Sequence, residues 1–152
     1  MQTWLMKSEP DTFGIDDLKA CPKGTEHWDG VRNYQARNMM RDQMKKGDRV
    51  LFYHSACKVP GIAGIAKVVK EAYPDHTAQN PESKYYDPKA TADNPRWFMV
   101  DVKFERKLKR LIPLSELRDN PALAGMQLLK KGNRLSIMPV DEAHWQAILA
   151  ME

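Results

Sequence analysis

The run from Trp28 to Asn38 combines a large aromatic ring with several planar hydrogen-bonding groups around a glycine. It reads Trp-Asp-Gly-Val-Arg-Asn-Tyr-Gln-Ala-Arg-Asn. An aromatic face can stack on a nucleobase, while Asn, Arg and backbone groups can hydrogen-bond to the edge of the base. The same run could instead be a turn that leads into a helix, with Trp28 in the core and Asn33 as the N-cap. The segment therefore indicates either a site for a flat polar ligand or a structural turn.

Residues in and around this run also include the types that hydrolases use. His54, Ser55 and Asp29 have the chemistry of a nucleophile, a base and an orienting group, with Glu9 as a further carboxylate. Adjacent residues on a strand point to opposite faces, so His54 and Ser55 would not face one site. The sequence has no Gly-x-Ser-x-Gly elbow and no glycine-rich phosphate loop, and its four histidines lack metal-ligand spacing. The sequence therefore favours binding over catalysis and predicts no metal and no cofactor.

The net charge of +4, from 24 Lys and Arg against 20 Asp and Glu, is compatible with a polyanionic partner but is weak support for one. Its distribution is more informative, because residues 103–110 hold five cations and one carboxylate. The five are Lys103, Arg106, Lys107, Lys109 and Arg110. Such a segment predicts contacts to phosphate groups. The alternative is a solvated strand edge whose lysines prevent pairing with another sheet.

The length of 152 residues suits a single domain over residues 1–152 with its own hydrophobic core. The sequence shows no signal-peptide pattern and no apolar run of membrane-spanning length, so we expect no membrane partner. Two cysteines are too few for a disulfide framework and suit a reducing compartment. We therefore expect a soluble, monomeric protein of the cytoplasm.

The apolar pattern predicts strands separated by short helices and irregular connections. Strands are expected at Thr3–Lys7, Arg49–His54, Gly61–Glu71, Arg96–Arg106 and Arg134–Met138. Helices are expected at Ile15–Lys19, Tyr34–Met44, Leu114–Leu117, Ala122–Leu128 and from an Asp141 cap through Leu149. Ala20–Asn33 is interpreted as a loop, and Tyr73–Pro95, with four prolines, as a long ordered loop. These elements predict an α+β fold built on a curved, partly closed sheet.

The strand expected at Arg96–Arg106 shows the clearest alternation of apolar and polar residues in the chain. Phe98 and the residues at every second position after it are assigned to the core face. Trp97 is therefore expected to point away from the core, beside the Tyr73–Pro95 loop. Its ring needs another partner there, either a ligand or a sheet edge that it covers.

Four blocks of the sequence together resemble EVE-domain proteins of the thymocyte nuclear protein 1 type, in the PUA-like superfamily. The blocks are Trp4–Pro10, Trp28–Asn38, Val50–Ser55 with Gly61–Ala66, and Pro95–Val102. The resemblance runs almost end to end, and its Trp-Asp-Gly-Val-Arg-Asn segment with the following Ala-Arg-Asn is specific. It implies a PUA-like curved β-barrel of about five or six strands flanked by short helices, and kinship with YTH domains, which hold a modified base in an aromatic cage. The chain lacks the extended charged N-terminal tail of the eukaryotic members.

The resemblance also implies a partner: nucleic acid bearing a modified base, notably a modified cytosine in DNA, with RNA left open. Trp28 would form one wall of the pocket and Trp97 is a candidate second stacking surface. Ser8 and Asn33 would read the edge of the base, while Arg32 and the 103–110 segment would hold phosphate. Tyr53 and His54 alternate on their strand, so one of them is expected to face the pocket. The implied ligand-binding residues are Lys7, Ser8, Glu9, Trp28, Asp29, Val31, Arg32, Asn33, Tyr53, His54, Ser55 and Trp97.

Two other functions stay open. ASCH-type relatives in the same superfamily suggest an amidohydrolase acting on a modified nucleoside, with Lys7 as base and Glu9 as proton shuttle. A lysine base would need burial or a nearby cation to lower its pKa. A protein-interaction module is the third possibility, with Tyr85 and Tyr86 of the Tyr73–Pro95 loop as anchors. An open cleft flanked by Trp28 and Trp97 would favour base binding.

Overall fold

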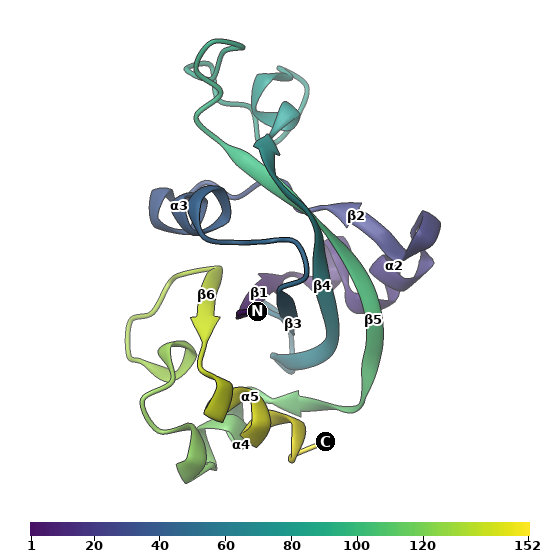
Figure 1. Ribbon diagram of the computed structural model, residues 1–152, viewed down its shortest axis with the longest axis vertical. Coiled ribbons are helices and arrows are strands. Elements are labelled where there is room, and N and C mark those ends of the chain that lie inside the picture. Colours follow the sequence, from purple (N-terminus) through teal and green to yellow (C-terminus); the bar gives the residue numbers. More distant parts are fainter.

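Six strands form one mixed sheet in the order β2-β5-β4-β3-β1-β6 in the computed structural model, which describes residues 1–152 (Figure 1). The pair β1 and β3 is parallel, and the other four pairs are antiparallel. The strands are β1 (Thr3–Ser8), β2 (Thr25–His27), β3 (Arg49–His54), β4 (Gly61–Pro74), β5 (Phe98–Pro113) and β6 (Ile137–Val140).

Short helices connect and cover these strands. The α-helices are α1 (Pro10–Phe13), α2 (Ile15–Ala20), α3 (Tyr34–Asp42), α4 (Leu114–Asp119) and α5 (Glu142–Leu149). The 3-10 helices are η1 (Pro22–Gly24), η2 (His76–Gln79), η3 (Pro121–Leu123) and η4 (Gln127–Leu129). With nine residues in the longest of them, α3, the helices include none that could span a bilayer.

The central strands are buried on both faces. Trp4 and Met6 of β1 belong to one hydrophobic cluster, whereas Leu5 between them belongs to another. Helix α3 contributes to the first cluster, and α4 and α5 contribute to the second. Successive side chains of a strand point to opposite faces, so these helices cover opposite faces of the sheet (Figure 1).

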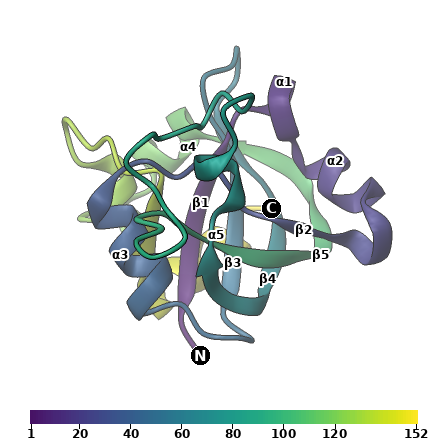
Figure 2. The same cartoon turned by 90° about the horizontal axis from the view of Figure 1, so that it is seen from above.

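The two longest strands bend the sheet. Strands β4 and β5 have 14 and 16 residues, and the register between them shifts at several positions. Such bulges increase the local twist and bend of a strand, and the sheet curls around its interior in the view from above (Figure 2). A Cβ atom at Gly64 would lie 2.7 Å from Ile15 and 2.9 Å from the carbonyl oxygen of Arg106, so only glycine permits this close packing. The expected α+β class with a curved sheet of about six strands is confirmed.

Several element boundaries differ from those predicted from the sequence. Helix α1 and strand β2 were not expected, and β5 continues to Pro113 instead of ending at Arg106. The helix expected at Ala122–Leu128 is wrong, because Gly125 has a φ of +84° and separates two 3-10 turns. The last strand begins at Ile137, three residues later than expected.

Candidate functional site

A cavity of about 880 Å³ opens where β1 ends, between that strand end, the Trp28–Asn33 segment and the Tyr73–Pro95 loop. This volume falls in the usual range for small-ligand sites, about 300–1,000 Å³. We name it the base cavity for the ligand that the sequence predicts. Its lining residues are Lys7, Ser8, Glu9, Thr12, Phe13, Glu26, His27, Trp28, Asp29, Gly30, Val31, Arg32, Asn33, Ser55, Lys84, Tyr85, Arg134, Leu135 and Ser136.

Nine of the twelve ligand-binding residues that the sequence predicted line this cavity, and Tyr53, His54 and Trp97 do not. The nine are Lys7, Ser8, Glu9, Trp28, Asp29, Val31, Arg32, Asn33 and Ser55. The structure therefore brings together residues from β1, from the segment after β2 and from the end of β3. Their contact with a ligand stays a prediction.

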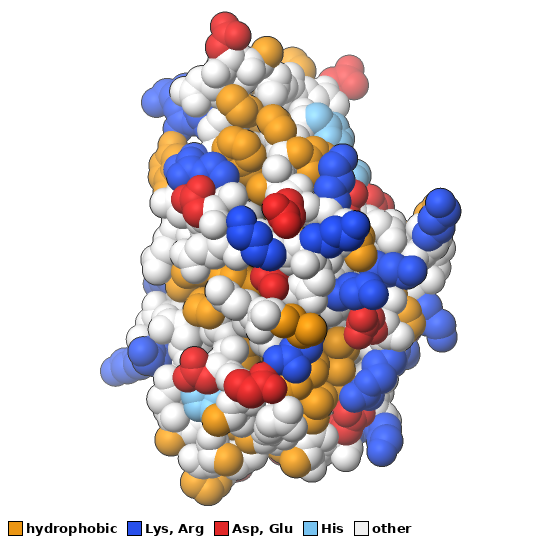
Figure 3. Space-filling view, viewed as in Figure 1, with side chains coloured by type: hydrophobic (Ala, Val, Ile, Leu, Met, Phe, Trp, Pro, Cys, Tyr) orange, Lys and Arg blue, Asp and Glu red, His pale blue; other side chains and the backbone are white.

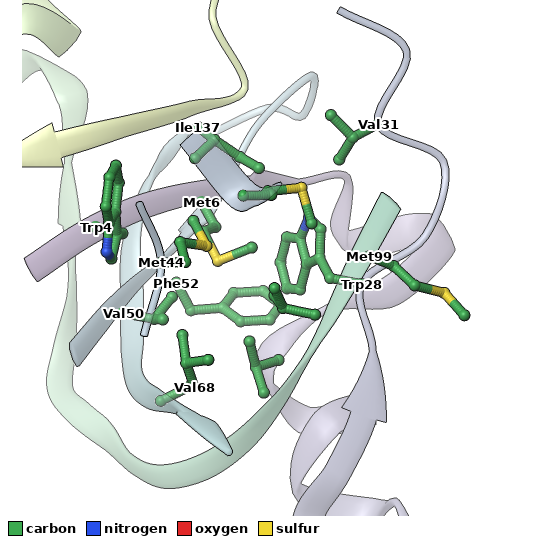
Figure 4. Close-up of a cluster of buried hydrophobic side chains, with 14 of the residues drawn as sticks. Trp4, Met6, Trp28, Val31, Met44, Val50, Phe52, Val68, Met99 and Ile137 are labelled. Atoms are coloured by element: carbon green, nitrogen blue, oxygen red, sulfur yellow. The ribbon is translucent and has the colours of Figure 1, made fainter. Parts of the chain in front are cut away.

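Trp28 belongs both to the core and to the cavity wall. Its ring is 8% exposed and meets Phe52 edge to face at 5.4 Å between ring centroids, among the apolar side chains of Figure 4. Its backbone N–H donates to the carbonyl of Val100 at 2.7 Å, which fixes the segment against β5. The Trp28 indole N–H donates to no protein group. It is also absent from the fully buried side-chain nitrogens and oxygens without a hydrogen-bond partner, of which Arg96 Nε is the single example. The Trp28 indole N–H is therefore accessible to solvent.

Asp29 presents a second polar group without strong partners. The nearest basic side chain is that of His27, whose Nε2 lies 3.7 Å from the carboxylate, and 31% of the Asp29 side chain is exposed. Burial raises the pKa of Asp29, and the neighbouring charges of Asp75 and Glu26 act in the same direction. The carboxylate is thus a hydrogen-bond acceptor that gains from a donating ligand.

Gly30 lets the Tyr73–Pro95 loop close over the cavity. Its φ of +78° suits glycine, and a Cβ atom there would lie 2.5 Å from the ring of Tyr85. The Gly30 N–H also donates to Asp75 Oδ2 at 2.9 Å. Tyr85 therefore packs directly on the glycine and becomes part of the cavity wall.

Arg32 holds the same loop in place. Its guanidinium donates to Asp75 Oδ2 at 3.0 Å, to the Tyr85 carbonyl at 2.8 and 3.1 Å, and to Thr77 Oγ1 at 3.3 Å. Burial opposes the ionisation of Asp75, but hydrogen bonds from Thr77, Gly30 and Arg32 more than offset it and lower the pKa of that carboxyl. This geometry does not favour the phosphate contact predicted for Arg32, because its guanidinium already donates to groups within the protein.

Lys7, Ser8 and Glu9 follow one another at the end of β1. Burial lowers the pKa of Lys7, and neither Lys7 nor Glu9 forms an ion pair. The Ser8 hydroxyl donates to the carbonyl of Phe13 at 2.6 Å. Ser8 can thus accept a hydrogen bond from a ligand but does not offer its proton.

Tyr53 and His54 stabilise the fold on the two faces of β3. Tyr53 is 3% exposed within the second hydrophobic cluster. His54 Nε2 accepts a hydrogen bond from the N–H of Ile15 at 3.1 Å, and burial lowers the pKa of this imidazole. The expectation that one of the two faces the cavity is wrong: β3 ends at His54, and Ser55, the next residue, lines the cavity instead.

Trp97 anchors the Tyr73–Pro95 loop outside the cavity. Its indole N–H donates to Asp87 Oδ2 at 2.7 Å, and its ring stacks on Tyr34 at 4.8 Å between centroids. Only 5% of the residue is exposed. The cleft flanked by Trp28 and Trp97 that we expected is therefore flanked by Trp28 and Tyr85 instead. Tyr86, the other tyrosine considered as an interaction anchor, is 42% exposed.

The basic segment 103–110 lies on β5 and contributes no residue to the cavity. Three of its five cations are paired: Arg106 with Glu152 at 2.6 Å, Lys107 with Asp16 at 2.9 Å, and Arg110 with Glu116. Figure 3 shows blue side chains interleaved with red ones along that side of the molecule. The predicted phosphate contact of this segment stays a prediction.

Sequence reasoning missed half of the cavity wall. The additional residues are Thr12, Phe13, Glu26, His27, Gly30, Lys84, Tyr85, Arg134, Leu135 and Ser136. Gly30 and His27 lie within or beside the motif, so the motif itself could have indicated them. The others come from α1, from β2, from the Tyr73–Pro95 loop and from the segment before β6, and no local pattern signals their approach.

Comparison with known proteins gives the family of this chain. The EVE domain model matches residues 2–151. Human thymocyte nuclear protein 1 is 49% identical over 166 aligned residues, which cover 98% of this chain and 73% of the human protein. The crystal structure of human THYN1 protein in complex with DNA containing 5-methylcytosine has a TM-score of 0.94 at 48% identity, covering 99% of this chain and 97% of that one.

A more distant likeness concerns the fold alone. The YTH domain of the Zygosaccharomyces rouxii MRB1 protein, solved in complex with N6-methyladenosine RNA, has a TM-score of 0.55 at 11% identity. The alignment covers 99% of this chain and 83% of the YTH chain. Together with the near full-length match to thymocyte nuclear protein 1, these findings confirm the resemblance seen in the sequence: the chain belongs to the EVE-domain family.

Proposed function

We propose that this protein binds nucleic acid and holds one modified cytosine, first of all 5-methylcytosine, in the base cavity. The observation that carries the proposal is a cavity large enough for a nucleobase, lined by Trp28, whose indole N–H has no protein partner, and by Asp29, whose carboxylate is partly buried. The complex of the human relative with DNA containing 5-methylcytosine supports the same ligand.

The polar groups of the wall complement the edge of a cytosine. Its exocyclic amine donates, which suits the carboxylate of Asp29, while its ring nitrogen and carbonyl accept. The Trp28 indole N–H and the side-chain amide of Asn33 are donors at the same cavity. The Asn33 Oδ1 is already used, because it accepts from the N–H of Ala36 at 3.0 Å and caps α3. A mixed wall of this kind reads a base that has left the stack.

Apolar side chains at the cavity suit the methyl group and the ring face. Val31 and Leu135 offer aliphatic surface, and Phe13 and Tyr85 offer aromatic surface. Stacking on such surfaces contributes about 1–3 kcal/mol per base. Trp28 itself is too deeply packed to supply a whole open face, so we assign it the edge of the base rather than the stack.

Equilibrium binding to matched oligonucleotides tests the proposal. The strands differ at a single cytosine, which is unmodified or 5-methylated, and are offered as single- and double-stranded DNA and as RNA at one fixed salt concentration. We expect tighter binding to the methylated strand, and we expect free 5-methyl-deoxycytidine to compete for the site. Equal affinity for the methylated and the unmodified strand in all three forms would contradict the proposal.

A nucleoside amidohydrolase is the second candidate, favoured by one observation: burial lowers the pKa of Lys7 at the cavity, as a lysine base requires. Incubation with N4-acetylcytidine, followed by chromatography of the products, tests it. Release of cytidine that is abolished in Lys7→Met would support hydrolysis. An intact substrate after long incubation would leave binding as the function.

We further propose that the 152 residues act as one monomeric domain in the cytoplasm. One cooperative unfolding transition, a monomer mass in light scattering and recovery in the cytoplasmic fraction are the expected results. The relatives carry the word nuclear in their name, so recovery in a nuclear fraction is the outcome that would contradict the proposed location.

A further inference from the structure

We propose that the phosphate backbone of the bound strand follows a groove between the turn Lys130–Arg134 and the start of α3, which we name the turn groove. The inference rests on the proposed function, since it concerns the strand from which the base enters the cavity. The main contact to phosphate is then the turn groove and not the basic segment 103–110 on β5.

The turn groove is continuous with the base cavity. It has a volume of about 390 Å³, and Asn33, Arg134 and Leu135 line both hollows. The segment that precedes β6 runs beside α3, in agreement with the shared lining (Figure 1). A strand with one base in the cavity would therefore have its neighbouring nucleotides at the groove.

The charge of the groove suits phosphate. Lys130, Lys131 and Arg134 line it together with amide side chains, and no carboxylate is among its lining residues. All three cations are exposed, and none takes part in an ion pair. On β5, by contrast, Arg106 is held by Glu152 through two hydrogen bonds of 2.6 and 2.8 Å. Cations that lack protein partners keep their full charge for a polyanion.

The backbone of the turn is fixed although its cations are free. Asn133 donates its N–H to the carbonyl of Lys130 at 3.1 Å, and its Oδ1 accepts from Gln127 Nε2 at 3.1 Å. Gly132 provides the φ of +77° that the turn requires, and Leu135 is buried just beyond it. The turn thus presents its three cations from a defined position, which reduces the ordering cost of binding.

A matched pair of double variants tests the inference. Lys130→Gln/Lys131→Gln removes two unpaired, exposed lysines of the turn groove, and Lys103→Gln/Lys109→Gln removes two unpaired, exposed lysines of β5. Both lose the same charge far from the core. The probes are the 5-methylcytosine oligonucleotide over a series of salt concentrations and free 5-methyl-deoxycytidine.

We expect the turn-groove variant to bind the oligonucleotide about tenfold or more weakly at about 0.1 M salt, with the slope of log K against log salt reduced by about 1.4 to 1.8. Its affinity for the free nucleoside and its preference for the methylated strand should equal those of the wild type. The β5 variant should bind like the wild type.

The outcomes separate this inference from the proposed function. Unchanged oligonucleotide binding by the turn-groove variant, or a loss confined to the β5 variant, would overturn the inference while the preference for methylated cytosine stands. A wild type without that preference whose binding still depends on the turn lysines would overturn the proposed function and keep the phosphate path. A wild type that binds no oligonucleotide would overturn both.

Discussion

The wall of the base cavity and the anchor of the Tyr73–Pro95 loop contain the same residue types, tryptophan and aspartate. At the anchor these side chains are hydrogen-bonded within the protein, and at the wall they are not. Each contains a buried tryptophan, Trp28 at 8% exposure and Trp97 at 5%. At the anchor, the Trp97 indole donates to Asp87, and the buried Asp75 accepts several hydrogen bonds. At the wall, the Trp28 indole has no partner and Asp29 has only a distant imidazole.

The difference shows that burial alone does not separate a binding residue from a structural one. Buried polar groups in proteins are nearly always hydrogen-bonded. Groups beside a cavity that lack partners are therefore the ones that a ligand can satisfy. The direction of the pKa shift follows the same division, since the pKa of Asp75 is lowered and that of Asp29 is raised.

Asp75→Ala should have the largest effect, because it removes the buried centre of the anchor. Arg32 and the N–H of Gly30 would lose their acceptor, and breaking a buried ion pair typically costs about 3–5 kcal/mol. Urea unfolding measures the loss, and limited proteolysis should show faster cleavage within Tyr73–Pro95. Asp29→Ala is the matched control at the wall. A loss of stability there as large as in Asp75→Ala would erase the distinction between the two regions.

Gly30→Ala should have the second largest effect on stability, because the added methyl group displaces Tyr85 from the cavity wall. The positive φ alone costs about 1 kcal/mol for a residue with a side chain, and Tyr85 must also move to admit the Cβ atom. We expect a total loss of about 2–3 kcal/mol together with weaker binding of the oligonucleotide. Gly132→Ala is the control, since Gly132 has a φ of +77° but open space at its Cβ position. Equal losses for the two variants would mean that Tyr85 yields without cost.

Trp28→Phe and Trp97→Phe compare the two indoles directly. Trp28→Phe breaks no hydrogen bond within the protein and should lower the free energy of unfolding by about 1 kcal/mol. Trp97→Phe also breaks the bond to Asp87 and should lower it by about 1.5 kcal/mol more. Loss of the Trp28 donor should weaken binding of methylated cytosine about tenfold, the value of one hydrogen bond of about 1.4 kcal/mol. Trp97→Phe should leave affinity unchanged. Fluorescence titration of both variants checks this, and equal affinities would remove Trp28 from the recognition of the base.

Asp29→Asn should have the smallest effect on stability, and the effect should be favourable. Because burial raises the pKa of Asp29 above its ordinary value of 3.8, the ionised carboxylate destabilises the folded state at neutral pH. The wild type should lose stability relative to the variant as the pH rises from 3.8 through the raised pKa, and the difference should then stay constant. Melting temperatures of both proteins across this range measure it. A difference that is independent of pH would contradict the assignment, as would tighter cytosine binding by Asp29→Asn at pH 7.

Much of the fold follows from local sequence pattern. The apolar residues of β1 and β3 and the helix that begins after Asn33 gave correct elements, and the Asn33 side chain caps α3 as expected. Strand β2 escaped notice because its sequence, Thr-Glu-His, has no apolar periodicity. It exists through its pairing with β5, which is a contact between distant parts of the chain.

Trp97 lies beside the Tyr73–Pro95 loop and outside the two main hydrophobic clusters, as the alternation predicted, but the alternation could not identify its partner. Alternation holds only within a strand, and β5 begins at Phe98. Arg96 has a φ of +61°, which turns the chain just before Trp97. The indole therefore packs against the loop itself and donates to Asp87, and it does not line the base cavity.

The basic segment 103–110 has fewer unpaired cations than its sequence indicates, because three of the five form ion pairs. Its partners Asp16, Glu116 and Glu152 lie at least six residues away in sequence from the cations that they pair with. Counting charges along the chain cannot detect such pairs. The residues of the motif around Trp28 lie together at the base cavity because they come from one short stretch, with Gly30 at its turn.

The position of β1 in the sheet constrains how the chain assembles during synthesis. This strand, the first of the six in sequence, is flanked by β3 on one side and by β6, the last of the six, on the other. Until β6 arrives, one edge of β1 offers unpaired backbone groups, and its apolar side chains are open to other chains. Such edges promote aggregation. We therefore expect chains that lack β6 to aggregate more readily than chains in which the sheet is complete.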